Sequence, residues 1–382
     1  MHACASAHAP PPLELADVVR TYGEAFARTH VLRPEQRRAL RDIVRCRTAI
    51  LGGHLDVCTA CDFERPWYNS CRNRHCPKCQ SLAQARWVDQ RLERLLPIHY
   101  FHVVFTLPAE LRLVAMRHRE AVFDMLFESA AATLLVLGRD PERLDGELGV
   151  TMVLHTWTRE LLFHPHVHAI VTGGALSEDG TRWARAHRKF LFPIRVMGAL
   201  FRGKMIAALE RAHERAVIDL GGVDTRALRD KSWVVYAKRP FGGPEQVIRY
   251  LGRYTHRVGI SNKRLVAMDE RGVTFLTKHG KAVTISGQEM LARFVQHVLP
   301  TGFVKIRHYG LHSASHATTR LELARVVLGS KVVRVGKPDN SWQLLLTRLS
   351  GVDVRVCPVC HTPAVIQTPL PQPRSRAPPE AA

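Results

Sequence analysis

The chain has 382 residues, with 55 Lys and Arg against 34 Asp and Glu, and its formal charge is +21. That length is enough for two or three domains with a sizeable core. A positive excess on this scale favours a polyanionic partner, DNA or RNA by default. The sequence shows no secretory signal, no apolar run as long as a membrane span and no ATPase-type phosphate-binding loop. We therefore expect a cytoplasmic protein with no membrane partner.

Composition divides the chain before any motif does. Residues 1–12 and 363–382 are rich in Ala and Pro, which predicts disordered tails. Residues 13–48 carry the apolar spacing of two helices. The second of these helices presents a series of arginines: Arg37, Arg38, Arg41, Arg45 and Arg47. Simple solvation and contact with phosphates explain such a face equally well.

Potential zinc ligands are densest between residues 46 and 79. Two Cys-x-x-Cys pairs are separated there by fourteen residues, close to the spacing of a zinc ribbon. We expect these thiolates to hold one structural zinc ion: Cys58, Cys61, Cys76 and Cys79. Four further side chains offer a possible second zinc site: Cys46, His54, Cys71 and His75. Spacing alone does not divide these ligands between one or two ions.

The same module is basic, as a DNA-contacting finger would be. Its candidate DNA-binding residues are Arg72, Arg74 and Lys78. Far from it, Cys357 and Cys360 make half of another zinc site, which either takes partners from elsewhere or has lost its second half.

Periodicity and residue type predict the remaining elements. In chain order they are a helix at 80–96, a strand at 99–107, helices at 109–118 and 119–137, a strand at 149–161, a helix within 190–220, a strand at 231–238, short strands within 264–285, a helix at 286–298 and a strand or loop at 303–310. Mixed helices and short strands in this order predict an α+β fold.

Residues 164–174 hold three histidines at alternate positions, followed by an apolar run and two glycines. The period of two places His166 and His168 on one face of a strand, about 6–7 Å apart, where both can bind one divalent ion. A tight turn before this strand would place His155 of the preceding strand opposite His168. His155 is then either the third ligand or a hydrogen-bonded core histidine.

A second constellation lies about eighty residues downstream, in a helix expected from Pro244 to about Arg257. Tyr250 and Tyr254 are four residues apart, so both phenols lie on one helix face. A stripe of cationic side chains runs beside them: Arg249, Arg253 and Arg257. Gly252 between the tyrosines costs about 1 kcal/mol in a helix, but it permits close approach of a backbone or a ligand.

With the zinc, histidine and tyrosine blocks in place, the chain resembles the HUH endonuclease superfamily. Within it, the chain is similar to the two-tyrosine rolling-circle transposases of the insertion-sequence-91 family. The resemblance runs from about Cys46 to Ser313 and rests on ordered blocks at 46–54, 68–80, 154–157, 164–168, 201–204, 250–257, 260–262 and 303–310. One departure is Thr158-Arg-Glu160, where the family pattern has a Gly-Gln type of sequence, so the role of that loop stays open.

This resemblance implies an α+β fold: an HUH-endonuclease-like central antiparallel sheet with flanking helices, preceded by a small zinc-binding module. The expected division is a tail at 1–12, a helical and zinc-binding DNA-contacting domain at 13–97, a two-tyrosine catalytic domain at 98–320, a C-terminal extension with Cys-x-x-Cys at 321–362 and a tail at 363–382.

The implied activity is cleavage and rejoining of single-stranded DNA at element ends, through a 5′-phosphotyrosine on Tyr250 or Tyr254. The implied metal is Mg²⁺ or Mn²⁺ on His166, His168 and His155, since phosphate oxygens suit hard cations. Implied partners are single-stranded element ends and a possible host helicase, in the nucleoid.

Two other functions fit the same motifs. A replication initiator or relaxase would use the same histidines and tyrosines, although the zinc block argues against it. A non-catalytic zinc-ribbon DNA-binding protein would have kept a dead nuclease fold, but the intact histidines and tyrosines argue against decay. A covalent protein–DNA adduct distinguishes the non-catalytic protein from the two enzymes.

Overall fold

The protein is described here from a computed structural model of the whole chain. The described residues are 12–238, 246, 252, 259–277, 280–330 and 341–370. Within them the fold is a mixed α+β arrangement whose sheets are antiparallel, as predicted.

A five-stranded sheet forms the centre, in the order β12-β4-β5-β3-β8. Its strands are β3 (Tyr100–Thr106), β4 (Gly149–Trp157), β5 (Phe163–Thr172), β8 (Val235–Lys238) and β12 (Ile306–Gly310). These strands are rich in β-branched and aromatic residues, which fit a pleated, half-buried surface. The predicted strand at 149–161 ends at Trp157, because residues 158–162 form the turn into β5.

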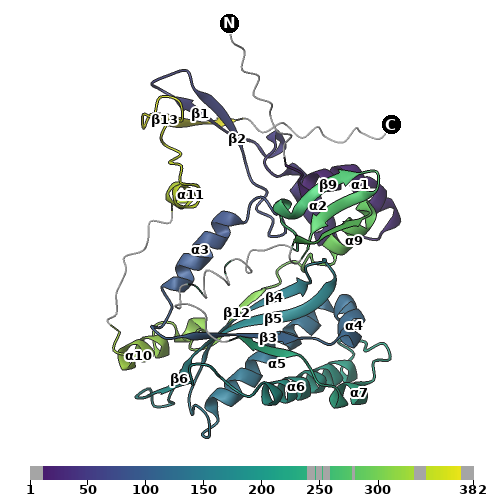
Figure 1. The fold of residues 1–382 in the computed structure, drawn as a ribbon, viewed down its shortest axis with the longest axis vertical. Helices are drawn as coiled ribbons and strands as arrows, with labels where there is room; N and C mark the ends of the chain where they lie inside the picture. Colours follow the sequence, from purple (N-terminus) through teal and green to yellow (C-terminus); the bar gives the residue numbers. More distant parts are fainter. Residues whose placement is uncertain are drawn as a thin grey trace.

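One face of this sheet is apolar and covered by helices (Figure 1). Every second residue of β5, including Val167, Ala169 and Val171, packs there. The covering helices are α4 (Arg112–Arg117), α5 (Arg119–Arg139), α6 (Ile194–Glu214) and α7 (Thr225–Asp230). Among the described helices, α5 alone has the length and apolar composition of a membrane span, and most of its apolar window is buried in this core.

The opposite face of the sheet carries polar side chains and is only partly covered. Trp87, from α3 (Ser81–Leu92), packs there against Tyr100, Val153 and Ile170. Because residues alternate along β5, His166 and His168 lie on this same face as Ile170. We call it the histidine face.

The two N-terminal helices, α1 (Leu15–Thr29) and α2 (Pro34–Arg45), do not form a separate unit with the zinc ligands. They share one core with α9 (Gly287–Val295) and with a three-stranded sheet of β9 (Leu265–Asp269), β10 (Gly272–Leu276) and β11 (Ala282–Ile285). The apolar stripes of α1 and α2 find their partner surface there, so the predicted boundary at residue 97 does not separate two independent cores.

The C-terminal part returns to the N-terminal module, near the hairpin at the top of Figure 1. Strand β13 (Val365–Leu370) pairs with β1 (Gly53–Cys58), whose other neighbour is β2 (Glu64–Tyr68). The prediction of a disordered tail from residue 363 is therefore wrong for these six residues, because they complete a sheet. Helices α10 (Arg320–Val327) and α11 (Trp342–Ser350) precede β13 in the chain.

A small separate sheet consists of β6 (Gly174–Leu176) paired with β7 (Trp183–Arg185).

Candidate functional site

Three imidazoles meet on the histidine face. The candidate ligand atoms of His155, His166 and His168 all lie within 4.8 Å of one another. His155 comes from β4 and the other two from β5, so the pairing of two strands builds the cluster. Neutral imidazoles are common ligands of divalent transition metals, and this donor set fits one such ion.

The register of β4 and β5 differs from the predicted one by two residues. His155 lies opposite His166, and Val153 lies opposite His168. The turn between the strands is centred earlier in the chain than the prediction assumed, and a bulge follows His155. A shift of two residues keeps every side chain on its face, so His155 still reaches the cluster.

Thr158-Arg-Glu160, the segment that departs from the family pattern, lies in the turn between β4 and β5. The Thr158 hydroxyl accepts hydrogen bonds from the backbone N–H groups of Glu160 and Leu162, each at 3.2 Å. A threonine side chain that satisfies turn amides in this way fixes the chain reversal locally. The loop thus has a structural role in this chain.

Hydrogen bonds and burial prepare these imidazoles for metal binding. His166 Nδ1 lies 2.7 Å from the carbonyl oxygen of His164, so Nδ1 donates and the lone pair of Nε2 is left for a ligand. Burial lowers the pKa of His166 to about 4 and that of His168 well below its ordinary value. Both rings are therefore neutral at pH 7, the form that binds a metal.

A fourth histidine supports the cluster from β3, and the sequence reasoning missed it. His102 Nε2 lies 2.8 Å from His168 Nδ1, and the two rings stack with an interplanar angle of 5°. Burial lowers the pKa of His102 to about 4. The contact with His102 thus fixes the ring orientation of His168. The period of two in β3 could have placed His102 on this face.

Trp157 completes the wall beside His155. Its ring stacks on His155 with centroids 4.7 Å apart, and His297 meets Trp157 edge-on at 5.9 Å. His155 itself is only 3% exposed. Its ring plane is thus held by packing, which reduces the freedom that metal binding would otherwise remove.

The predicted tyrosine site falls largely outside the described residues. This applies to Tyr250, Tyr254 and the cationic stripe: Arg249, Arg253 and Arg257. Gly252, between the tyrosines, is described as helical and buried. A Cβ atom built on it would lie 2.4 Å from Val88 Cγ2 of α3, so the glycine allows the close approach that the sequence suggested. Gly252 therefore lies against α3, which also covers part of the histidine face.

The first cysteine cluster consists of Cys46, Cys71, Cys76 and Cys79, whose sulfur atoms lie within 4.8 Å of one another. Cys71 Sγ and Cys79 Sγ are 3.7 Å apart. Tetrahedral zinc with Zn–S bonds of about 2.3 Å requires sulfur atoms about 3.8 Å apart, so the set fits structural zinc. Cys46 and Cys76 are fully buried, and burying four thiolates without a cation would be costly.

The second cluster consists of Cys58, Cys61, Cys357 and Cys360. The predicted set of Cys58, Cys61, Cys76 and Cys79 is thus wrong, because β13 brings the C-terminal pair beside the first knuckle. His54 and His75 are also not zinc ligands here. His54 Nε2 lies 3.1 Å from Gln367 Nε2, and buried His75 accepts a hydrogen bond from the N–H of Leu299.

Of the predicted DNA-binding residues in the zinc module, only Arg72 is exposed. The guanidinium of Arg74 donates to the carbonyl oxygens of Phe303 and Pro300, at 2.5 and 2.7 Å. Lys78 forms an ion pair with Glu14 at 2.5 Å. Arg74 and Lys78 therefore hold the module to the rest of the protein.

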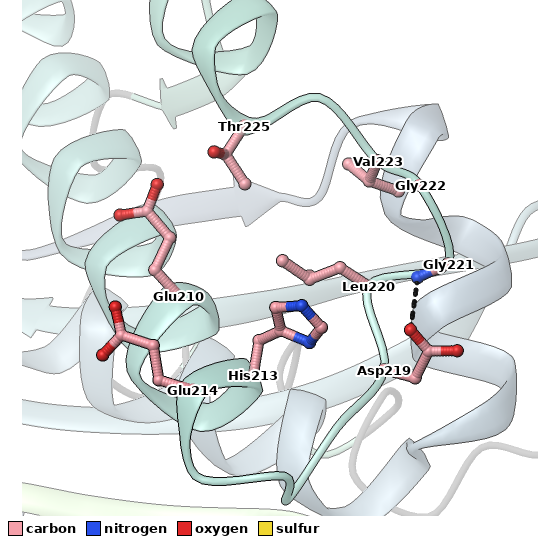
Figure 2. A pocket seen from close by; sticks show the side chains of 9 residues that line it. All are labelled: Glu210, His213, Glu214, Asp219, Leu220, Gly221, Gly222, Val223 and Thr225. Carbon is pink, nitrogen blue, oxygen red and sulfur yellow. Dashed lines mark hydrogen bonds between the residues drawn. The ribbon is translucent and has the colours of Figure 1, made fainter.

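A cavity of about 360 Å³ lies between α6 and α7, away from the histidine face (Figure 2). Figure 2 shows Glu210, Glu214, Asp219 and His213 around it. Glu210 is paired with Arg229, and Asp219 accepts a hydrogen bond from the N–H of Gly221. Its acidic lining makes it unsuited to a phosphate backbone.

Comparisons with known proteins agree with these features. The family described as "Transposase zinc-binding domain" matches residues 18–107, and the family described as "Putative transposase" matches residues 149–319. The chain is 42% identical over 369 residues to "Putative transposase y4qJ" of Sinorhizobium fredii, covering 91% of this chain and 93% of that protein. It is 28% identical over 302 residues to "Transposase for insertion sequence element IS801" of Pseudomonas savastanoi pv. phaseolicola, covering 73% and 70%. The search of solved structures gives no match.

We predict that Arg74→Ala destabilises the protein whereas Arg72→Ala does not. Hydrogen bonds from a charged donor to buried carbonyls contribute about 1.5–3 kcal/mol, and the exposed Arg72 should contribute less than about 0.5 kcal/mol. Thermal unfolding of the two variants beside the parent protein measures the difference. Equal melting temperatures for both variants would contradict the anchoring role of Arg74.

Proposed function

The chain belongs to the insertion-sequence-91 family of transposases, and from that premise we propose that it cleaves and rejoins single-stranded DNA at the ends of a mobile element. The observation that carries this proposal is the cluster of His155, His166 and His168 on the partly open histidine face. The finer fold assignment, an HUH-endonuclease-like domain, is part of the same proposal and is supported by two of those histidines lying at alternate positions of a central antiparallel strand.

The nucleophile would be the phenol of Tyr250 or Tyr254. Its oxygen attacks the scissile phosphorus, the bond from phosphorus to the 3′ oxygen breaks, and that oxygen leaves as a 3′-OH after taking up a proton. The downstream fragment stays on the tyrosine through its 5′ phosphate, as a phosphodiester, and the phenol proton is released. A covalent intermediate of this kind keeps the energy of the broken bond for rejoining, so no ATP is required.

His155, His166 and His168 are the residues that would hold Mg²⁺ or Mn²⁺. A divalent ion there supplies electrostatic stabilisation of the charge that develops on the phosphate oxygens. The protein contributes the fixed geometry, since His164 and His102 orient the rings of His166 and His168. Because the ligand rings are already oriented, less free energy is spent on reorganising the site when the phosphate binds.

DNA affinity is proposed to come largely from elsewhere on the surface. Arg37, Arg41 and Arg45 are exposed and four residues apart, so they form one stripe along α2. Asp42 is the acid beside them, 3.7 Å from the guanidinium of Arg41. A stripe of cations on a module next to the histidine domain suits the sugar–phosphate backbone of an element end.

The first prediction concerns the two tyrosines. In the helix predicted from the sequence they would be about 6 Å apart along the axis, so only one phenol could be in line with the scissile phosphate at a time. Tyr250→Phe and Tyr254→Phe should differ, one losing initial cleavage and the other cleaving without completing strand transfer; we assign initiation to Tyr250. A denaturing gel with labelled single-stranded element ends and Mn²⁺ detects the covalent adduct.

If the doubly substituted protein still nicked that DNA, the nucleophile would be water or another side chain. The tyrosine mechanism would then be wrong.

The second prediction separates metal binding from DNA binding. His166→Ala should abolish cleavage and adduct formation, because one ligand of the cluster is lost, while affinity for single-stranded DNA changes less than about threefold. The matched control is His187→Ala, since His187 is an exposed histidine outside the cluster. Cleavage at the parent rate by the His166 variant would exclude the cluster as the catalytic metal site.

The third prediction concerns salt and the α2 stripe. Contact with six to ten phosphates would lower the affinity by about 10³–10⁵-fold between 50 and 200 mM salt. Replacing Arg37, Arg41 and Arg45 with Glu should weaken binding strongly and flatten this salt dependence. The same charge change at three exposed arginines serves as control: Arg211 on α6, Arg215 directly after it and Arg226 on α7. Fluorescence anisotropy with single-stranded oligonucleotides measures both, and equal losses for the two variants would contradict a binding surface on α2.

A further inference from the structure

The second cysteine cluster is built from both ends of the described chain. Cys58 Sγ lies 3.6 Å from Cys360 Sγ, and Cys61 Sγ lies 3.7 Å from Cys357 Sγ. These separations match the roughly 3.8 Å between sulfur ligands of a tetrahedral zinc ion. Cys357 and Cys360 lie outside both family matches, which cover residues 18–107 and 149–319.

Each Cys-x-x-Cys pair is folded in the same way. The N–H of Ala60 donates to Cys58 Sγ, and the N–H of Val359 donates to Cys357 Sγ, both at 3.4 Å. Backbone N–H groups aimed at sulfur stabilise the thiolate that a metal requires. Two equivalent knuckles facing each other form a complete tetrathiolate set.

Pairing of β13 with β1 brings the knuckles together. The register runs from Gly53 opposite Leu370 to Cys58 opposite Val365. Beyond the last pair, the N–H of Thr59 donates to the carbonyl oxygen of Ala364 at 2.9 Å. Gln367 Nε2 donates a hydrogen bond to the carboxylate of Asp56, which is 1% exposed. Trp67 Nε1 donates a second hydrogen bond to the same carboxylate.

Helix α11 precedes the knuckle of Cys357 and Cys360 in the chain, and it lies against α3. Arg348 of α11 forms an ion pair with Asp89 of α3 at 2.6 Å, and the Asp89 side chain is 16% exposed. The neighbouring residue, Val88, is the one that Gly252 of the tyrosine motif approaches. Helix α3 also begins directly after the first cluster, since Ser81 follows Cys79 by two positions.

We propose that Cys58, Cys61, Cys357 and Cys360 bind a second structural zinc ion, which fastens the C-terminal segment to the zinc module and holds α11 as a brace on α3. One zinc cluster then fixes the beginning of α3 through the chain, and the other supports its side through α11. Because Gly252 and the histidine face both lie against α3, loosening the brace should slow the proposed cleavage. The zinc and bracing parts stand without the proposed function; the effect on cleavage rests on it.

The first test measures zinc and local protection in full-length protein purified without chelator. The parent should contain two zinc ions per chain, and Cys357→Ser/Cys360→Ser should contain one. In the same variant, amide hydrogen exchange should speed up in β13, α11 and α3 but not in α5. Two zinc ions in the variant, or one in the parent, would overturn the site.

A second variant tests the brace with both zinc ions in place. Arg348→Glu puts like charges beside Asp89, so exchange in α3 should rise while zinc content stays at two. The control is Arg355→Glu, on the same segment, since Arg355 pairs with Asp353 and not with α3. Unchanged exchange in α3 for Arg348→Glu and the double serine variant would overturn the brace.

A third experiment compares the rate of adduct formation between the parent protein and the double serine variant. Misplacement of a reacting group by about 1 Å can cost about 100-fold in rate, so the double serine variant should form the adduct up to about 100-fold more slowly than the parent. An equal rate would show that the brace does not position the tyrosines. If the parent forms no adduct, the proposed function fails, while zinc content and exchange still decide the brace.

Discussion

The pairing of β4 with β5 is the constraint on which the candidate site depends. One face of this strand pair is buried against α5 and α6, and that burial fixes which residues point inward. A slip by one residue would turn Val167 and Ala169 to the histidine face and His166 and His168 into the apolar core. The cost of burying two imidazoles without partners in that core excludes this alternative. The same hydrophobic burial that stabilises the sheet therefore assembles the metal ligands.

The first cysteine cluster poses a different problem: its sulfur atoms pack against the core of α1, α2 and α9, but that packing does not offset the charge of a thiolate. Four thiols within 4.8 Å of one another are stable only when a cation offsets their charge or when they stay protonated. Hydrogen bonds within the cluster hold the pKa of Cys46 far below its ordinary value and raise the pKa values of Cys71 and Cys76, so the four thiols do not all ionise without a cation. Because zinc in such sites supplies folding energy directly, the arrangement of residues 46–79 depends on metal as much as on sequence.

Patterns among neighbouring residues predicted those features of the site that depend on neighbouring residues alone. The alternation at 164–168 was enough to place His166 and His168 on one strand face, and turn geometry brought His155 to them. The exact register needed the length of the turn, which Thr158 sets by hydrogen bonding to Glu160 and Leu162. A period of two is read from neighbouring residues, whereas a register depends on how a loop closes.

The errors in assigning zinc ligands and DNA-binding cations concern contacts between distant segments. Cys58 and Cys360 are separated by 302 positions, and their spacing carries no information about that contact. Arg74 and Lys78 have the composition of a DNA-binding surface, but Arg74 donates to carbonyls 226 and 229 residues away. Arginine with an apolar stem and five donors serves equally well as an internal anchor, so charge alone could not assign its role.

Arg74 also shows how the two halves of the proposed activity are connected. Burial keeps His166 and His168 neutral, so the histidine face contributes little positive charge for holding DNA before a metal binds. In the proposed function the exposed cations of α2 provide that charge, and α2 shares a core with α9. Arg74 holds the zinc module to Pro300 and Phe303, just ahead of β12, which pairs with the β4 strand that carries His155. In the proposed function, DNA bound along the module is held relative to the histidine cluster through a short path of hydrogen bonds, and we expect substitutions at either end of that path to alter binding and cleavage separately.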